Sequence, residues 1–355
     1  MQWKQMEWPL MVDSLNLLAF VGAPITVFVD EGGTVRAINP PRDSLKDFLN
    51  ADYDVDPTSA WLTNRPVARG LLAESTQDSA RRGDLEFLWG GVDGVDRAIG
   101  AYRRILSRNP DDASIYFRLG VAYRQRYDGE GRQSDDFAQA VTHWSKALEM
   151  NPNQYIWRRR IQQYGPRLAK PYSFYDWIHE ARETIADWGE VPVPLAVEPG
   201  GAEFAYPAES FVGAKSAVNP DAEGRIYRDS ERLVRIESTV VPGQVQPGDV
   251  MRVHIVMQPD EARKVHWNNE VGDLVLWVDV PDGWQVDAAL HQYSVPPAPV
   301  TVEPRKVEFE VKTSTEGTPL HDIVRGYVLY YICEGVNGQC LYRRQDFEVN
   351  VPFGS

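Results

Sequence analysis

The sequence predicts a multidomain α+β protein with a helical middle part and a C-terminal antiparallel β-sandwich. Its 355 residues are more than one hydrophobic core usually fills, so two or three domains are expected. Between residues 93 and 152 apolar residues recur at helical spacing. From residue 225 onward, short β-branched and aromatic runs are separated by turns rich in proline and glycine. We therefore expect four segments: residues 1–55, 75–188, 189–224 and 225–355.

Composition excludes two classes of partner. Hydrophobic residues make up 43% of the chain and charged residues 25%, which is typical of a folded protein. The formal net charge of −14 opposes binding to a phosphate backbone, which requires clustered lysine and arginine. The chain contains no apolar run of about 18 residues, the length that spans a bilayer. We therefore expect no nucleic-acid partner and no membrane insertion.

The N-terminal segment, residues 1–55, contains an expected β-hairpin. Pro24 enters a β-branched run, Glu31–Thr34 supply the turn and Val35–Ile38 return. With a helix from Ser44 to Leu49, this order resembles the second half of the thioredoxin fold in redoxin-type proteins, where a proline, usually cis, precedes a strand ending in aspartate. The half that carries Cys-x-x-Cys is absent, so the resemblance implies a fragment or a docking remnant. In a thioredoxin, Pro24 would lie beside the substrate; a rigid strand entry is the alternative.

The helical middle part repeats itself. Two sets of residues share offsets of 4, 3 and 5: Ala98, Tyr102, Ile105 and Pro110, and then Ala140, Trp144, Ala147 and Pro152. A small residue, a large aromatic, another small or apolar residue and a helix-stopping proline, in this order, resemble the second helix of a tetratricopeptide repeat. The first-helix pattern lies between the two sets and consists of Tyr116, Leu119, Gly120 and Tyr123. The small Gly120 would let the two helices approach closely.

The resemblance implies one full repeat and part of an earlier one. Tyr127–Ser134 is expected to be a loop insertion, which lengthens the repeat at little entropic cost. The earlier repeat and the caps are expected at Ser79–Trp89, Gln154–Tyr164 and Ser173–Trp188. Tetratricopeptide grooves bind peptides or proteins, so the resemblance implies a protein ligand, with Tyr116 and Tyr123 as contact residues. So short an array must also lean on neighbouring domains.

The C-terminal part follows a linker, residues 189–224, that is rich in proline, glycine and alanine. Strands are expected at Leu233–Val241, Val250–Gln258, Leu274–Val280, Lys306–Lys312, Gly326–Cys333 and Leu341–Val351. That many short strands within residues 225–355 predict an antiparallel sandwich of the immunoglobulin type. His266–Glu270 is expected to be a turn or a binding loop between strands.

The only two cysteines, Cys333 and Cys340, end one expected strand and begin the next. The loop between them places the two side chains near one another, where a disulfide is feasible. Three states are open: a structural bridge, a redox-active bridge and two reduced thiols.

The surroundings of the cysteines resemble the N-terminal, immunoglobulin-like domain of the DsbD thiol:disulfide reductases. The matching residues are Tyr330, Tyr331, Cys333, Gly338, Cys340 and Tyr342. The resemblance implies that the cysteine pair is catalytic and exchanges electrons with thioredoxin-like partners through mixed disulfides, with Tyr331 and Tyr342 at the contact. It also implies an extracytoplasmic, periplasmic location, although no signal peptide is visible and a cytoplasmic location stays open.

Several features differ from that family. Arg343 and Arg344 stand where that family has prolines. Two interpretations are open: one of these arginines lowers the pKa of the Cys340 thiol, or both lie on a solvent-facing strand edge. His291–Tyr293 is the expected cover over the cysteines. We expect no cofactor and no metal, because the six histidines lack ligand spacing. The alternative to thiol:disulfide exchange is a tetratricopeptide scaffold that binds a protein and whose disulfide is structural.

Overall fold

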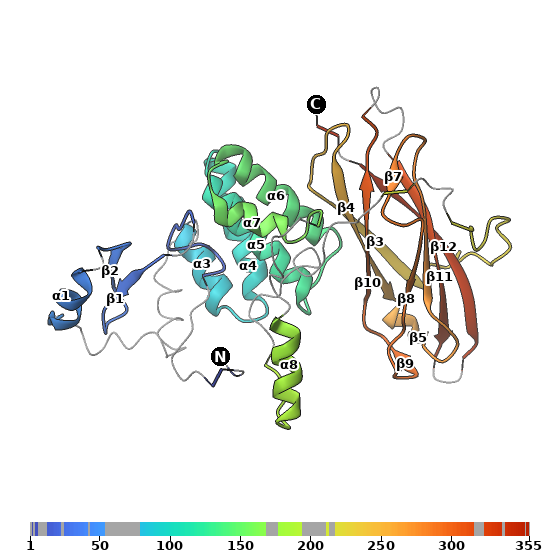
Figure 1. The fold of residues 1–355 in the computed structure, drawn as a ribbon, viewed down its shortest axis with the longest axis horizontal. Coiled ribbons are helices and arrows are strands. Elements are labelled where there is room, and N and C mark those ends of the chain that lie inside the picture. Colours follow the sequence, from blue (N-terminus) through green and yellow to red (C-terminus); the bar gives the residue numbers. More distant parts are fainter. Residues whose placement is uncertain are drawn as a thin grey trace. The chain divides into compact units, whose positions relative to one another are not determined.

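The computed structural model describes residues 13–22, 25–41, 43–53, 79–167, 177–193, 217–315, 323–335 and 338–351, with short pieces at 2, 4–5, 211–212 and 353–354 (Figure 1). It divides into two compact units, Pro9–Arg160 and Ile161–Ser355, the second of which includes Met1–Trp8. Helices fill most of the first unit and antiparallel sheets most of the second. The mixed α+β class expected from the sequence is therefore confirmed.

The first unit begins with the expected hairpin. Strands β1 (Val27–Val29) and β2 (Val35–Ile38) are antiparallel, and helix α1 (Ser44–Asn50) follows them. The Asp30 carboxylate accepts hydrogen bonds from two backbone N–H groups of the turn, which fixes its shape. Pro24 lies outside the described residues.

Five further helices of the chain pack in sequence. They are α3 (Ala80–Trp89), α4 (Gly94–Arg108), α5 (Ala113–Asp128), α6 (Asp136–Met150) and α7 (Tyr155–Gln162). Side chains cap two of them: Ser79 accepts from the N–H of Arg82, and Asp112 accepts from the N–H of Ile115. The expected helix at Ser79–Trp89 is α3. The expected loop insertion starts at Gly129 and not at Tyr127, because α5 continues to Asp128.

The second unit contains helix α8 (Trp177–Asp187) and two antiparallel sheets. One sheet has the strand order β3-β4-β10-β7, and the other has β8-β6-β11-β5-β9 with β12 paired to β11. Their bounds are β3 (Val234–Val241), β4 (Val250–Pro259), β5 (Val265–Asn268), β6 (Leu274–Asp279), β7 (Gln285–Val286), β8 (Leu290–Tyr293), β9 (Val300–Thr301), β10 (Arg305–Lys312), β11 (Ile323–Glu334) and β12 (Cys340–Asn350). All six expected strands are present.

One hydrophobic core joins the two sheets. Alternate residues of β4, such as Val253 and Ile255, and Phe309 of β10 are fully buried in it together with Trp267 and Tyr330 of the second sheet. This alternation is what a half-covered strand requires. Two expectations are wrong: His266–Asn268, expected in a turn or binding loop, lie in β5, and His291–Tyr293, expected to cover the cysteines, lie in β8 beside β6.

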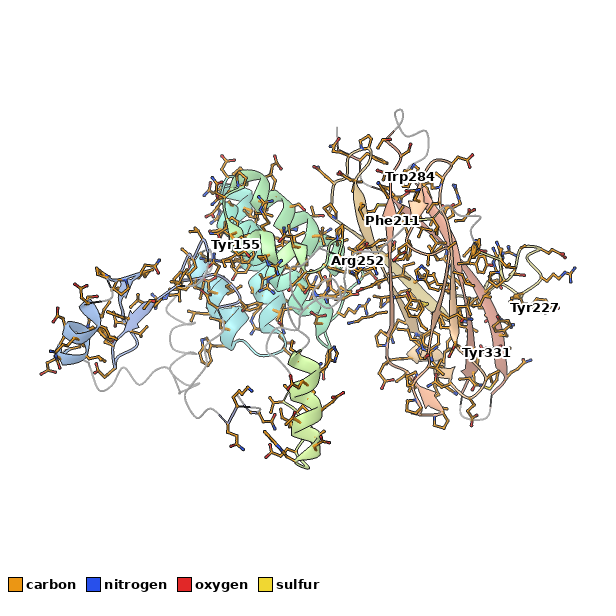
Figure 2. The ribbon with its side chains drawn as sticks, in the orientation of Figure 1. Tyr155, Phe211, Tyr227, Arg252, Trp284 and Tyr331 are labelled. Carbon is orange, nitrogen blue, oxygen red and sulfur yellow. A yellow bond between two sulfur atoms is a disulfide. The ribbon has the colours of Figure 1, made fainter. Side chains whose placement is uncertain are left out.

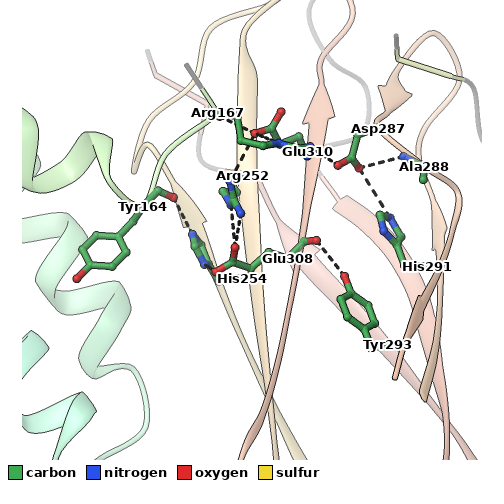
Figure 3. Close-up of polar contacts among 10 residues, drawn as sticks. All are labelled: Tyr164, Arg167, Arg252, His254, Asp287, Ala288, His291, Tyr293, Glu308 and Glu310. Atoms are coloured by element: carbon green, nitrogen blue, oxygen red, sulfur yellow. Dashed lines mark hydrogen bonds and ion pairs between the residues drawn. The ribbon is translucent and has the colours of Figure 1, made fainter. Parts of the chain in front are cut away.

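The outer face of β4 and β10 carries buried charged residues, which we call the outer-face ion cluster (Figure 3). Arg252 forms an ion pair with Glu308. The His254 ring lies between two acceptors, with Nδ1 2.9 Å from Glu308 Oε1 and Nε2 2.7 Å from the carbonyl oxygen of Tyr164. Both ring nitrogens therefore lie within hydrogen-bonding distance of an oxygen acceptor.

Arg167 ties the chain that follows α7 to the same cluster. Its Nε lies 2.9 Å from Glu310 Oε1, and its Nη2 lies 2.5 Å from Asp287 Oδ2. Burial alone would lower the pKa of Arg167, but the two carboxylates raise it above the ordinary value. These contacts explain why charged residues on an outer face are buried, because residues 161–167 cover them.

Candidate functional site

The helical hairpins of the first unit are built on close approaches between a glycine and an aromatic ring. A Cβ atom added to Gly120 of α5 would lie 2.5 Å from Cδ1 of Trp144 in α6. A Cβ atom added to Gly83 of α3 would lie 2.8 Å from Cδ1 of Tyr102 in α4. Both distances are shorter than real Cβ contacts, so neither helix pair leaves room for a side chain. The same contact is therefore made twice, once in each hairpin.

The two hairpins are joined by a polar contact between α3, α4 and α5. The Tyr102 hydroxyl donates to Asp84 at 2.8 Å, and Arg118 Nη1 lies 2.9 Å from the other carboxylate oxygen of Asp84. Burial raises the pKa of Asp84 and outweighs the opposite effect of Arg118 and Tyr102. Since Arg118 belongs to the second hairpin, this carboxylate links one repeat to the next.

The loop insertion between α5 and α6 is tied down by Arg126. Its Nη2 lies 2.6 Å from Asp136 Oδ1, and its Nη1 lies 2.5 Å from Asp96 Oδ1 of α4. The Gln133 N–H donates to the other oxygen of Asp136 at 2.8 Å. The buried end of the insertion is thus fixed, and its tip around Glu130 is exposed.

The two tyrosines expected to contact a ligand lie at different depths. Tyr123 is 1% exposed and belongs to the core, whereas Tyr116 is half-buried. Both rings pack on His143 of α6, with centroids 5.3 and 6.0 Å away. Burial lowers the pKa of His143, whose Nδ1 lies 2.7 Å from the carbonyl oxygen of Gln139. Of the two, only Tyr116 presents surface to a partner.

Exposed apolar side chains occur together at the end of α3. Leu88 and Trp89 occupy the last two positions of the helix, and Val92 follows in the turn before α4; all three are exposed. These residues were not predicted from the sequence, although three large apolar residues within five positions are a visible signal. Contiguous exposed apolar surface commonly marks a protein contact.

The cysteines form a disulfide, with an S–S distance of 2.02 Å. Cys333 on β11 and Cys340 on β12 are directly opposite one another, and Cys333 is buried while Cys340 is exposed. Tyr331, which is labelled in Figure 2, and Tyr342 form a stacked pair on the same two strands, with ring centroids 4.4 Å apart. The structure thus brings together all four residues predicted for this site: Cys333, Cys340, Tyr331 and Tyr342.

The arginines and the cover expected near the disulfide lie elsewhere. Arg344 pairs with Asp221 at 2.8 Å and with Asp346 at 2.7 Å, and the Arg343 guanidinium lies 6.0 Å from the ring centroid of Tyr227. The residues expected as a cover, His291–Tyr293, form strand β8 beside β6. On the other side of Cys333, β5 places His266 directly opposite it.

The described residues show no metal centre and no spanning helix. Within these residues, no group of three or more histidine, cysteine, aspartate or glutamate side chains is arranged to hold a metal ion. Nor is any helix in the described parts of the chain long and apolar enough to cross a membrane.

No protein-family model matches the chain. Among solved structures, segments are similar to the ApaA protein of Bordetella pertussis, at 10% identity over 34% of this chain and 92% of that one, with a TM-score of 0.22. The sporulation control protein Spo0M of Bacillus subtilis is similar at 10% identity over 35% of this chain and 50% of that one, with a TM-score of 0.16. These likenesses carry no argument about fold or function.

Among curated proteins, the chain is similar to photosystem I assembly proteins named Ycf3. The protein from Synechococcus sp. strain CC9605 is 31% identical over 117 residues, which cover 31% of this chain and 67% of that protein. The protein from strain WH7803 is 28% identical over 125 residues, which cover 32% of this chain and 67% of that protein. The tetratricopeptide-type character expected of the helices is thereby confirmed, and through this segment the chain belongs to the Ycf3 family.

Proposed function

We propose that this protein is a non-enzymatic assembly scaffold that binds a protein partner through its tetratricopeptide-type helices. The observation that carries the proposal is the repeated glycine-to-aromatic contact, Gly83 with Tyr102 and Gly120 with Trp144, which builds two hairpins of the repeat type. The Synechococcus relatives are assembly proteins by name, which supports the same role here. This was the alternative function that the sequence left open.

The surface most suited to a partner is the end of α3. Leu88, Trp89 and Val92 expose apolar area there, and half-buried Tyr116 offers a second contact on α5. Burying a large apolar side chain contributes roughly 1.5–3 kcal/mol, so two or three such residues supply much of the affinity of a scaffold contact.

The experiment is site-specific photocrosslinking from the full chain in its native cells. A benzophenone amino acid replaces Leu88 in one variant and Val218, an exposed apolar residue of the second unit, in the control variant. We expect one defined protein to be crosslinked from position 88 and not from position 218. Its association should weaken at least about tenfold in Trp89→Asp, since a charge replaces an exposed aromatic side chain that the proposed complex would bury. Equal crosslinking from both positions would contradict the proposal.

Thiol:disulfide exchange is the second candidate, and it rests on a different observation. Cys340 is exposed, and His266 lies opposite Cys333 on the neighbouring strand. The resemblances of the sequence to thioredoxin-like and DsbD-like proteins support such an exchange site in an extracytoplasmic compartment. The reduction potential separates the two candidates, because a structural bridge lies below about −300 mV and an exchange site above it.

A further inference from the structure

The two sheets of the second unit present two strand edges to a common groove. Among the described strands, β3 pairs only with β4, and β12 pairs only with β11. A groove of about 1010 Å³ lies between the two edges. Ile236 and Ser238 line it from β3, and the residues from Arg344 to Glu348 line it from β12.

The backbone of β12 has hydrogen-bonding groups directed away from β11. The Glu334 N–H donates to the carbonyl oxygen of Gln339, so this pair is a hydrogen-bonded one. Such pairs alternate along an antiparallel ladder, and the register places the odd-numbered residues of β12 in them. The N–H and C=O groups of Asp346 and Glu348 therefore point to the outer edge. No strand of the described structure pairs with them there.

Strand β3 also has backbone groups directed away from its partner β4. The Asp260 N–H donates to the carbonyl oxygen of Leu233, so odd-numbered residues of β3 bond to β4. The backbone groups of Ile236 and Ser238 are directed to the outer edge, toward the groove. Within the described residues, two rows of donors and acceptors that pair with no strand thus border one groove, and such rows are a template for an added strand.

This chain already shows how a strand adds to the β12 edge. The Arg344 N–H donates to the carbonyl oxygen of Tyr227 at 2.9 Å, and the Asp229 N–H donates to the carbonyl oxygen of Arg344 at 2.8 Å. Residues 227–229 are therefore a short parallel partner of β12. The Asp229 carboxylate also accepts from the N–H of Val234 at 3.0 Å, which connects the same segment to β3. Tyr227 itself is exposed (Figure 2).

Three of the four arginines that line the groove, Arg228, Arg235 and Arg344, form ion pairs within the chain. Arg228 pairs with Asp346 at 2.8 Å, and Arg344 pairs with Asp346 and with Asp221, so these cations are neutralised within the chain. Between the charged walls lie the half-buried Ile236 and the buried Phe347. A polyanion would therefore meet few cations without a partner. An extended peptide with small apolar side chains could instead form main-chain hydrogen bonds with the strand edges and apolar contacts with these two residues.

We propose that this groove binds an extended segment of a partner protein by strand addition to β12 at Asp346 and Glu348, continuing the line begun by Tyr227–Asp229. Main-chain hydrogen bonds supply the affinity, and side chains of the added strand that face Ile236 and Phe347 supply the selectivity. This site is separate from the helical surface near Leu88, so it is a second, independent contact of the protein.

Two substitutions of Glu348 distinguish the contribution of its backbone N–H group to binding from that of its side chain. The full chain selects binders from a displayed library of random peptides of roughly ten residues, the length of a long strand. Glu348→Pro removes an N–H that bonds to no strand of the described sheet, and Glu348→Ala removes the same side chain but keeps that N–H. We expect the selected peptides to bind Glu348→Pro at least about tenfold more weakly than the wild type, and Glu348→Ala within about twofold.

Hydrogen exchange on the wild-type chain provides a readout that does not depend on the proline variant folding. A bound peptide should slow exchange at the amides of Asp346 and Glu348, and leave the amides of helices α3 to α7 unchanged. Failure to select any peptide, equal binding to both variants, or protection confined to the helices would each overturn the proposal. None of these outcomes affects crosslinking from position 88, which tests the scaffold function separately.

Discussion

Gly120 lies against the indole ring of Trp144, so that no side chain fits between helices α5 and α6. The relation between Gly83 and Tyr102 is its counterpart one hairpin earlier. In both hairpins, the first helix has a glycine at the position where an aromatic ring of the second helix packs against it. The aromatic rings of both contacts are fully buried, so neither ring can move aside into solvent to make room for a side chain.

The first prediction concerns these glycines. Gly120→Ala should lower the free energy of unfolding of the helical part by about 1–3 kcal/mol, because an overpacked contact forces the helices apart. Gly100→Ala in α4 is the matched control, since its added Cβ meets only the end of the Arg104 side chain at 3.4 Å. Alanine favours the helix interior, so this control should be stabilised by about 0.5–1 kcal/mol. Urea unfolding followed by circular dichroism measures both. Equal destabilisation would show that the contact with Trp144 is not the cause.

The second prediction concerns the link between the repeats. Tyr102→Phe removes the hydroxyl that donates to Asp84, and leaves the ring in place. We expect a loss of about 1.5–3 kcal/mol, the range for a hydrogen bond to a charged group. The double variant with Arg118→Met tests the coupling: if Asp84 joins both residues, the two losses will not add. Strict additivity in urea unfolding would mean that the two contacts are independent.

The third prediction is a pH dependence of the outer-face ion cluster. Burial would raise the pKa of Glu308, but His254 and Arg252 lower it from 4.5 to about 2. A lowered carboxylate pKa stabilises the folded state above the unfolded pKa, and this contribution is lost as the pH falls from about 4.5 toward 2. The wild type should therefore exceed Glu308→Gln in stability at pH 6, and the difference should shrink below pH 4. A difference that grows on acidification would contradict the assigned direction.

The fourth prediction separates a structural from an active disulfide. The bridge joins residues 7 positions apart. In the chain-entropy model, closing so short a loop contributes roughly 2–3 kcal/mol, and less where strands already hold the hairpin. The double variant Cys333→Ser with Cys340→Ser should lose stability in this range and still crosslink its partner from position 88. If the variant loses its partner while its thermal unfolding is unchanged, the cysteines act in exchange.

Much of this fold could be predicted because its signals are local. Six strands, the N-terminal hairpin and the helix α3 follow from periodicity and turn residues. The cysteine pair follows from two strands and one short loop. Gly120 could be recognised because Leu119 and Tyr123 surround it in the expected order. Gly83 was missed because fewer residues separate Gly83 from Tyr102 in the sequence than separate Gly120 from Trp144. Only the packing in the structure shows that the two contacts are equivalent.

The remaining features depend on contacts that are distant in sequence. Arg252 and His254 alternate with core residues and would be expected to face solvent, but residues 161–167 cover them. β5 contains His266 and Asn268 beside Trp267, and its polar composition conceals a strand that pairs with β11. Arg344 pairs with Asp221, which lies 123 residues earlier, and no local pattern could connect the two. In each case a partner far along the chain decides the environment.

The anchoring of the insertion by Arg126 has a use in protein engineering. Arg126 forms an ion pair with Asp136, whose carboxylate also accepts from the N–H of Gln133. These contacts fix the start of α6 independently of the conformation of the exposed tip near Glu130. Exposed loop tips with fixed ends accept inserted domains. A fluorescent reporter inserted after Glu130 would therefore leave both hairpins folded, and would let the abundance and position of this protein be followed in living cells without a tag at either terminus.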